Sequence, residues 1–166
     1  MEMDNSDVYE QLINAALRFV SFRARSRKEI LDFLTKKLSR SRTSAPLVLD
    51  YAMERLTELG YVNDDAFAQW WVGTRTGRKP KGAKAIRIEL IQKGVDGSVA
   101  ERAIGLLLKG DKSESMLARG LAVKKAEALG KYPKMAQRQK LSAFLMRRGF
   151  SSDTVWSVVD DVVGNV

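Results

Sequence analysis

The segment Ile86–Gly94, with the sequence IRIELIQKG, determines the fold because two other parts of the chain repeat its pattern. The counterparts are Ile30–Leu38 (ILDFLTKKL) and Leu141–Gly149 (LSAFLMRRG). When the three segments are aligned, a leucine and a cation recur at the same places: Leu34, Leu90 and Leu145, then Lys37, Lys93 and Arg148. A similarity that returns about every 55 residues is typical of a chain built from tandem structural units.

The apolar residues around these segments follow the spacing of a helix. Leu12, Ala16, Phe19 and Val20 fall at i, i+4, i+7 and i+8, which is one face of an amphipathic helix. Strand-like alternation and hairpin dipeptides are missing from the sequence, and the prolines lie between the periodic stretches. We therefore predict an all-α fold of three tandem three-helix repeats that pack against their neighbours. The expected divisions are an acidic N-terminal segment 1–15 and repeats at 16–63, 64–110 and 111–166.

Turn chemistry predicts where several helices begin and end. Three glycines follow the ends of periodic stretches, where a left-handed residue terminates a helix at no steric cost: Gly60, Gly94 and Gly149. Ser26 and Glu29 have the spacing of a capping box, in which each side chain bonds the backbone N–H of the other. Asn63 or Asp64 is expected to cap the helix that follows.

The aromatic residues divide into core and surface candidates. Trp70, Trp71 and Trp156 stand at helical core spacing beside apolar neighbours, so we expect them to pack in the interior rather than to stack on nucleic-acid bases. Tyr132 lies in a basic loop and is the better candidate for a contact with a partner.

Composition limits the chemistry that the chain can perform. Its 166 residues carry a formal net charge of +9 and include no cysteine or histidine, which excludes disulfides, thiolate nucleophiles, histidine bases and the common zinc sites. We find no catalytic constellation and no motif for a metal or cofactor, so an enzyme is the least favoured class. The cationic surplus predicts an anionic partner. The acidic N-terminus is unlike a secretory signal and no apolar run is long enough to span a membrane, so a cytoplasmic protein is expected.

The cations gather in the segments 18–42, 75–93 and 109–148, which cover the first and second helices of each expected repeat. A stack of repeats would align these segments into a basic stripe, whereas the alternative is that they form only solvated helix faces. The stretch Arg75–Arg87 (RTGRKPKGAKAIR) is expected to be a mobile basic loop that binds an anion. The candidate binding residues are Arg25, Arg27, Lys28, Lys36, Lys37, Arg75, Arg78, Lys79, Lys81, Lys84, Arg87, Lys93, Lys124, Lys125, Arg147 and Arg148.

Several of these positions occur together in a known family. They are Leu59–Asp64 (LGYVND), Phe67-Ala68, Arg75, Gly82, Glu89–Val95 (ELIQKGV) and Leu145-x-x-Arg148-Gly149-Phe150. Their order and spacing resemble the central signature and the last repeat of the RecX regulatory proteins, over about residues 16–160. The resemblance implies tandem three-helix repeats in an elongated, curved molecule.

The resemblance also implies a binding function without catalysis. RecX proteins bind the recombinase RecA, lie along the groove of the RecA–DNA filament and inhibit the ATPase, strand-exchange and coprotease activities of RecA in DNA repair, recombination and the SOS response. The leading hypothesis is therefore a monomer without cofactor that binds RecA through the basic stripe, with single- or double-stranded DNA as a further partner. The alternative is a helical protein that acts on DNA directly, because three-helix units resemble helix-turn-helix modules.

Overall fold

The computed structural model describes residues 5–40, 46–109 and 113–164, and within these ranges it consists of helices joined by loops, without a strand. Residues 41–42 and 110–112 of the basic segments named above lie outside the described residues. The described helices are α1 (Asn5–Ser21), α2 (Arg27–Arg40), α3 (Pro46–Glu58), α4 (Asp64–Arg75), α5 (Ala83–Gln92), α6 (Gly97–Leu107), α7 (Glu114–Leu129), α8 (Lys134–Arg147) and α9 (Ser152–Val163). The all-α prediction is confirmed.

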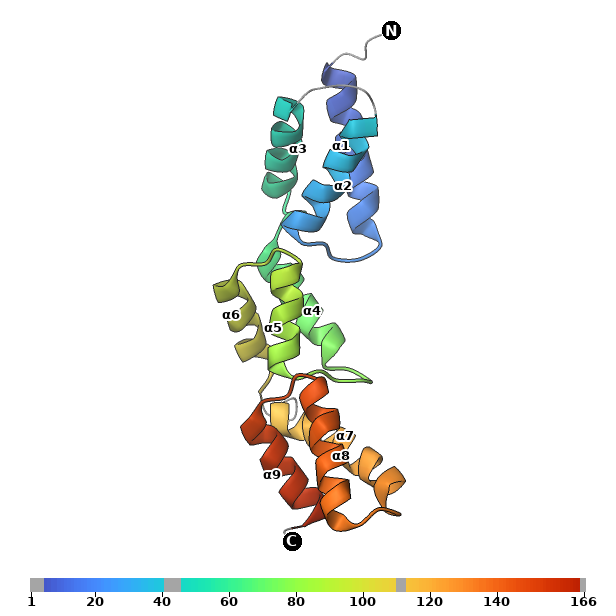
Figure 1. Cartoon of the computed structure of the whole chain (residues 1–166). Helices are drawn as coiled ribbons and strands as arrows, with labels where there is room; N and C mark the ends of the chain where they lie inside the picture. Colours follow the sequence, from blue (N-terminus) through green and yellow to red (C-terminus); the bar gives the residue numbers. More distant parts are fainter. Residues whose placement is uncertain (1–4, 41–45, 110–112, 165–166) are drawn as a thin grey trace.

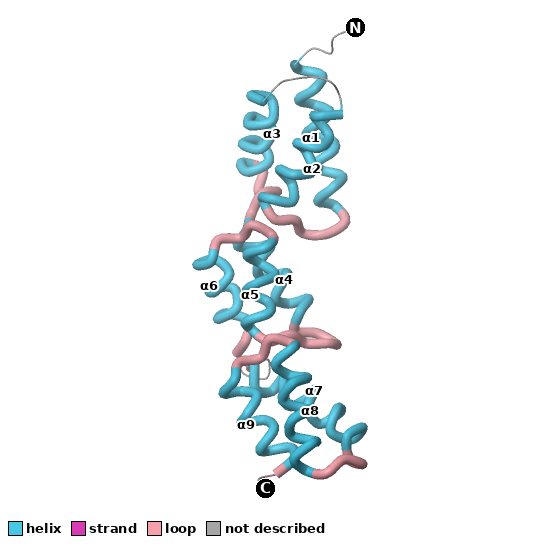
Figure 2. Tube along the Cα trace, in the orientation of Figure 1, coloured by secondary structure: helices cyan, strands magenta, loops and turns pink. Residues whose placement is uncertain are grey.

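The helices pack in threes, and each trio encloses a hydrophobic core of its own. The aligned leucines Leu34, Leu90 and Leu145 are fully buried, one in each core. The trios follow one another along a single long axis, so the molecule is elongated and gently bowed (Figure 1). Figure 2 shows that loops mark the two places where one trio gives way to the next. The prediction of tandem three-helix repeats is confirmed.

Helix α1 begins at Asn5 and runs through the division that we drew at residue 15. Val8 and Leu12 are buried in the first core, while the acids Asp7 and Glu10 occupy the exposed face of the same helix. Residues 5–15 of the expected acidic segment therefore belong to an amphipathic helix. The divisions at residues 15, 63 and 110 stay predictions, and residue 110 lies outside the described part of the chain.

The turn residues act as their chemistry predicts. The three glycines that end periodic stretches have positive φ angles, of 77° at Gly60, 80° at Gly94 and 81° at Gly149. The Ser26 amide donates to Glu29 Oε2 at 3.2 Å and the Glu29 amide donates to Ser26 Oγ at 3.1 Å, which is a complete capping box. Asn63 caps α4, since its Oδ1 accepts from the Ala66 amide at 2.9 Å.

The prediction for the tryptophans is confirmed at Trp71, which is 8% exposed, and wrong at Trp156, which is 50% exposed. Trp70 is half-buried and packs against the second core. In α9 the inward face is formed by Val155, Val158 and Val159, and Trp156 stands about a quarter turn away from it. Apolar character at a helical position does not by itself identify the face on which a side chain lies.

Candidate functional site

The second helices of the repeats, α2, α5 and α8, are stacked end to end. Ser26 Oγ, at the start of α2, donates to the carbonyl oxygen of Lys93, at the end of α5, at 2.7 Å. The Gly82 amide, at the start of α5, donates to the carbonyl oxygen of Arg148, at the end of α8, at 3.0 Å. Each hydrogen bond satisfies a carbonyl that the end of a helix leaves unpaired. It also brings the positive end of one helix dipole onto the negative end of the next.

We expect this stacking to be measurable as an elongated shape in solution. The second helices have 14, 10 and 14 residues. At about 1.5 Å per residue they make a rod roughly 60 Å long, with an expected radius of gyration of about 20 Å. A compact domain of this length has a radius of gyration of about 15 Å. Small-angle X-ray scattering over a concentration series distinguishes the two, and a value near the compact figure would contradict the stacked arrangement.

Each junction is closed by a carboxylate from the first helix of the following repeat. Asp64 Oδ1, at the start of α4, accepts from the Arg27 amide at 2.7 Å. Glu114 Oε1, at the start of α7, accepts from the Ala83 amide at 2.9 Å. Both acceptors satisfy an unpaired N–H in the first turn of a second helix, so the two junctions are built in the same way.

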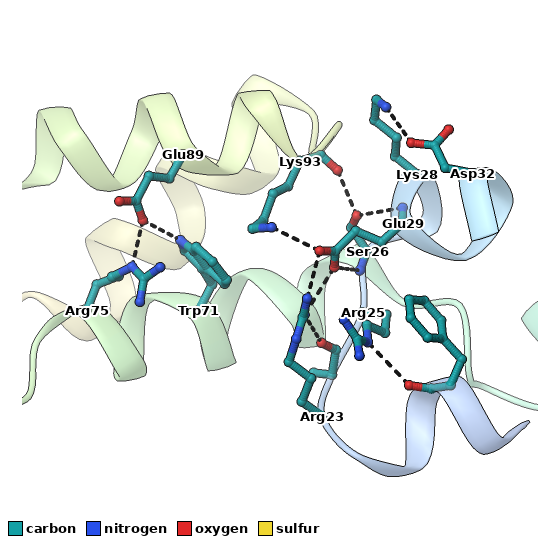
Figure 3. Close-up of polar contacts among 12 residues, drawn as sticks. Arg23, Arg25, Ser26, Lys28, Glu29, Asp32, Trp71, Arg75, Glu89 and Lys93 are labelled. Atoms are coloured by element: carbon teal, nitrogen blue, oxygen red, sulfur yellow. Dashed lines mark hydrogen bonds and ion pairs between the residues drawn. The ribbon is translucent and has the colours of Figure 1, made fainter. Parts of the chain in front are cut away.

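Glu29 is the centre of the first junction (Figure 3). Its carboxylate accepts two hydrogen bonds from Arg23, at 2.9 and 3.1 Å, and one from Lys93 Nζ at 2.9 Å across the junction. Burial would raise the pKa of Glu29, but the hydrogen bonds from Arg23, Lys93 and the Ser26 amide outweigh it and lower the pKa to about 2. The carboxylate is therefore charged at neutral pH and joins the first repeat to the second.

Glu89 holds a similar cluster within the second repeat. Its Oε2 accepts from Trp71 Nε1 at 2.9 Å and from Arg75 Nε at 2.7 Å, and its Oε1 accepts from Lys81 Nζ (Figure 3 shows the first two). The Arg75 guanidinium also lies 4.0 Å from the centre of a Trp71 ring. Burial would raise the pKa of Glu89, but the three hydrogen bonds outweigh it, and the pKa lies below its ordinary value of 4.5.

The structure pairs five of the candidate cations with acids of the same chain. Arg75 and Lys81 bind Glu89, while Lys93 binds Glu29. The other two pairs are Lys28 with Asp32 and Arg87 with Glu101. The expectation of a loop over Arg75–Arg87 is wrong in its second part, because α5 begins at Ala83 and only residues 76–82 join the two helices. Three cations of this stretch, Arg75, Lys81 and Arg87, are engaged within the chain.

The remaining candidates have no ion pair within the described residues. Arg25 is nevertheless engaged, because its Nε donates to the Phe19 carbonyl oxygen at 3.2 Å and its guanidinium lies 3.9 Å from the ring centre. Burial lowers the pKa of Arg25, with the charge of Arg23 as the next cause. Arg148 is engaged as well, because its guanidinium donates to the Pro80 carbonyl oxygen at 3.4 Å. The others are Arg27, Lys36, Lys37, Arg78, Lys79, Lys84, Lys124, Lys125 and Arg147.

Four of these cations gather beside aromatic rings in two grooves. Phe33, Lys36, Lys37 and Arg40 of α2 line the first groove. Lys125 of α7 and Arg147 of α8 help to line the second, together with Tyr132, Lys140 and Phe144. Arg78, Lys79 and Lys84 line neither. A single continuous stripe stays a prediction.

Sequence analysis missed Phe33, Phe144, Arg40 and Lys140 as parts of these grooves. The aligned segments hold a usable signal, since Phe33 and Phe144 occupy the same position. Glu89 stands there in the second repeat. The positions at which the aligned segments differ are therefore as informative as those that they share.

The described residues contain no group of three or more acidic, cysteine or histidine side chains arranged to hold a metal ion. Among the helices that the structure describes, none combines the length and the apolar character that crossing a membrane requires.

Comparison with known proteins gives consistent matches over nearly the whole chain. Residues 63–104 match the family model "RecX, second three-helix domain" and residues 114–159 match "RecX, third three-helix domain". The chain is 33% identical to the regulatory protein RecX of Chlorobium phaeobacteroides over 153 residues, covering 92% of this chain and 94% of that protein. It is 34% identical to that of Prosthecochloris aestuarii over 163 residues, covering 98% and 100%.

Other relatives are longer, and solved structures have the same fold. The chain spans 54% of the regulatory protein RecX of Listeria welshimeri and 59% of that of Bacillus subtilis. The crystal structure of RecX from Lactobacillus salivarius superposes with a TM-score of 0.81 at 29% identity, covering 95% of this chain and 97% of that one. A further crystal structure of a regulatory protein RecX gives a TM-score of 0.77 at 25% identity, covering 97% and 81%.

Proposed function

Since this chain belongs to the RecX family of regulatory proteins, we propose that it binds RecA and the RecA–DNA filament and inhibits RecA activity. The observation that carries the proposal is the match over nearly the full length of a family member, which includes every repeat of the array. It acts by binding and not by catalysis, without a cofactor, as a monomer in the cytoplasm, where RecA and DNA occur together.

The shape and the charge of the molecule support this mode of action. An elongated array of repeats presents an extended surface that fits the groove of a filament better than a compact domain would. Cations without an ion pair in the described chain occur in all three repeats, for example Lys36, Lys84 and Arg147. Such charges attract both an acidic groove wall and the phosphates of bound DNA.

Titration of the protein into a RecA ATPase assay tests the proposal. We expect hydrolysis of ATP by RecA on single-stranded DNA to fall when the protein is present below the stoichiometry of RecA, because one molecule in the groove affects several subunits. An unchanged rate at an equimolar ratio, with the cognate RecA and folded protein, would contradict it. A helical protein that binds free DNA directly would then be the better interpretation of this chain.

Three exposed cations of the second repeat are the first candidates for the contact. Replacing Arg78, Lys79 and Lys84 with glutamine together is expected to raise the concentration for half-inhibition about tenfold, because these charges are not neutralised within the described chain. The matched control replaces Arg55, Arg102 and Arg119, which lie in exposed ion pairs, and it removes the same charge. Equal weakening by the two variants would show that net charge alone matters and would remove this surface from the site.

A further inference from the structure

The groove between α7 and α8 combines aromatic rings with cations. It has a volume of about 510 Å³ and is lined by Lys125, Tyr132, Lys140, Phe144 and Arg147 among others. Tyr132 is 36% exposed and Phe144 is half-buried, so both rings are accessible from the groove. The side chains that line it, as far as the structure describes them, include no acid.

The cations of this groove are arranged around the two rings. Lys140 Nζ lies 4.8 Å from the centre of the Tyr132 ring, and Lys131 Nζ lies 5.5 Å from it. Lys125 Nζ and the Arg148 guanidinium lie 5.7 and 5.1 Å from the centre of the Phe144 ring. These cations lie over the faces of the rings, so a planar ligand that stacks on either ring displaces a cation from that face and keeps its positive charge close by.

The first repeat carries a similar combination of a ring and cations on α2 alone. Phe33 occupies the position of Phe144 in the aligned segments, and it borders a smaller groove of about 340 Å³ with Lys36, Lys37 and Arg40. Phe33 stacks on Phe19 with a ring-centre distance of 4.2 Å and an angle of 6° between the planes. The two outer repeats thus present the same combination of ring and cations at equivalent places.

The second repeat departs from this pattern because Glu89 stands where the outer repeats have phenylalanine. The Glu89 carboxylate accepts hydrogen bonds from Arg75, Lys81 and the Trp71 indole N–H, so the cations and the ring edge of this repeat are already bound within the chain. An acid at this position also repels an anionic ligand.

A ligand that contacts both the aromatic rings and the cations of these grooves must carry flat apolar faces and regularly spaced negative charges. An unpaired nucleic-acid strand has both, since its bases stack on aromatic side chains while its phosphates bind lysine and arginine. A duplex hides its base faces, and an acidic peptide offers charge without them. We propose that the α7/α8 groove and its counterpart on α2 are two equivalent binding sites for an unpaired nucleic-acid strand, and that Glu89 prevents the middle repeat from forming a third.

The proposal is tested with the full chain and fluorescent oligothymidine, without RecA, so its outcome is independent of the proposed function. We expect a strand of about 30 nucleotides to bind more tightly than one of about 6, because only the longer strand can reach both sites. A duplex of the longer length is expected to bind more weakly than the single strand. Equal binding of duplex and single strand would overturn the proposal, as would equal binding of polyglutamate.

Variants of residues in the α7/α8 groove distinguish the contribution of ring stacking to strand binding from the contribution of charge. Phe144→Ala is expected to weaken binding about tenfold, whereas Trp156→Ala, which removes an exposed ring that lines neither groove, should leave it unchanged. Because Phe144 also packs against the third core, the exposed pair Lys140→Gln and Arg147→Gln serves as a variant with little risk to folding. The double variant should weaken binding more than Lys124→Gln, an exposed cation outside the groove. No loss in either groove variant would overturn the proposal.

A change at Glu89 provides a test in the opposite direction. Glu89→Gln is expected to tighten binding of the longer strand about tenfold, because the released Arg75 and Lys81 can then bind its phosphates. Glu101→Gln makes the same charge change and releases the exposed Arg87, so it controls for net charge. Circular dichroism of both variants is the check that they are folded. Equal tightening by the two variants would contradict the role assigned to Glu89.

Discussion

Replacing Gly82 with alanine is expected to lower the free energy of unfolding by about 3 kcal/mol. Gly82 has an ordinary extended conformation, with φ −75° and ψ 163°, so alanine meets no backbone strain there. A Cβ atom at this position would overlap the carbonyl group of Gly149 and the nitrogen of Phe150. The third repeat would have to move away, and the hydrogen bond from the Gly82 amide to Arg148 would be lost.

Denaturant unfolding followed by circular dichroism measures this effect. Because the loss is confined to one junction, we also expect the transition to broaden as the third repeat uncouples from the other two. Gly105→Ala in α6 is the matched control, since a Cβ there has nothing within 4 Å. It should stabilise the helix by up to about 1 kcal/mol. If both variants were equally stable, the close approach of the two backbones would not contribute to stability.

Removing the carboxylate of Glu29 is expected to destabilise the chain by about 2 kcal/mol. The side chain of Glu29 is 19% exposed, and those of Arg23 and Lys93 are 30% and 24% exposed. Glu29→Ala would leave both cations partly buried without their partner, and it would break the capping box with Ser26. Asp32→Ala, which breaks an exposed pair on the same helix, is expected to cost no more than about 0.5 kcal/mol.

The same carboxylate gives a dependence on pH. Glu29 has a pKa of about 2 in the folded chain, compared with an ordinary value of 4.5. The unfolded chain therefore takes up a proton at this residue before the folded chain does, and the stability that Glu29 contributes is lost as pH falls from about 4.5 towards 2. Glu29→Gln lacks this titration while Glu89 and the other carboxylates remain. The stability difference between the two proteins should be constant above pH 4.5 and shrink below it. A difference that does not change with pH would contradict the assignment.

The repeats and many helix ends could be predicted because local rules determine them. The spacing of apolar residues is set by the pitch of the helix, and Leu34, Leu90 and Leu145 each occupy the centre of a core as their alignment predicts. Gly94 and Gly149 end helices because a left-handed residue is needed there, and Ser26 caps α2 through a residue three positions away. None of these inferences requires knowledge of a partner far along the chain.

Only the tertiary structure decided which charges remain available to a partner. Lys93 and Arg75 look equivalent to Lys84 in the sequence, yet the fold places Glu29 against the first and Glu89 against the second. Lys93 and Glu29 are 64 positions apart, and the stacking of α5 on α2 brings them together. Gly82 is a second example of a residue whose role depends on a distant one. A side chain cannot fit there, because the backbone of Gly149 in the next repeat lies against it. Charge and the local spacing of residues along the chain determine the repeats. The contacts between repeats determine the surface that the repeats present to a partner. The sequence does not show these contacts, because they depend on distances that no local pattern encodes.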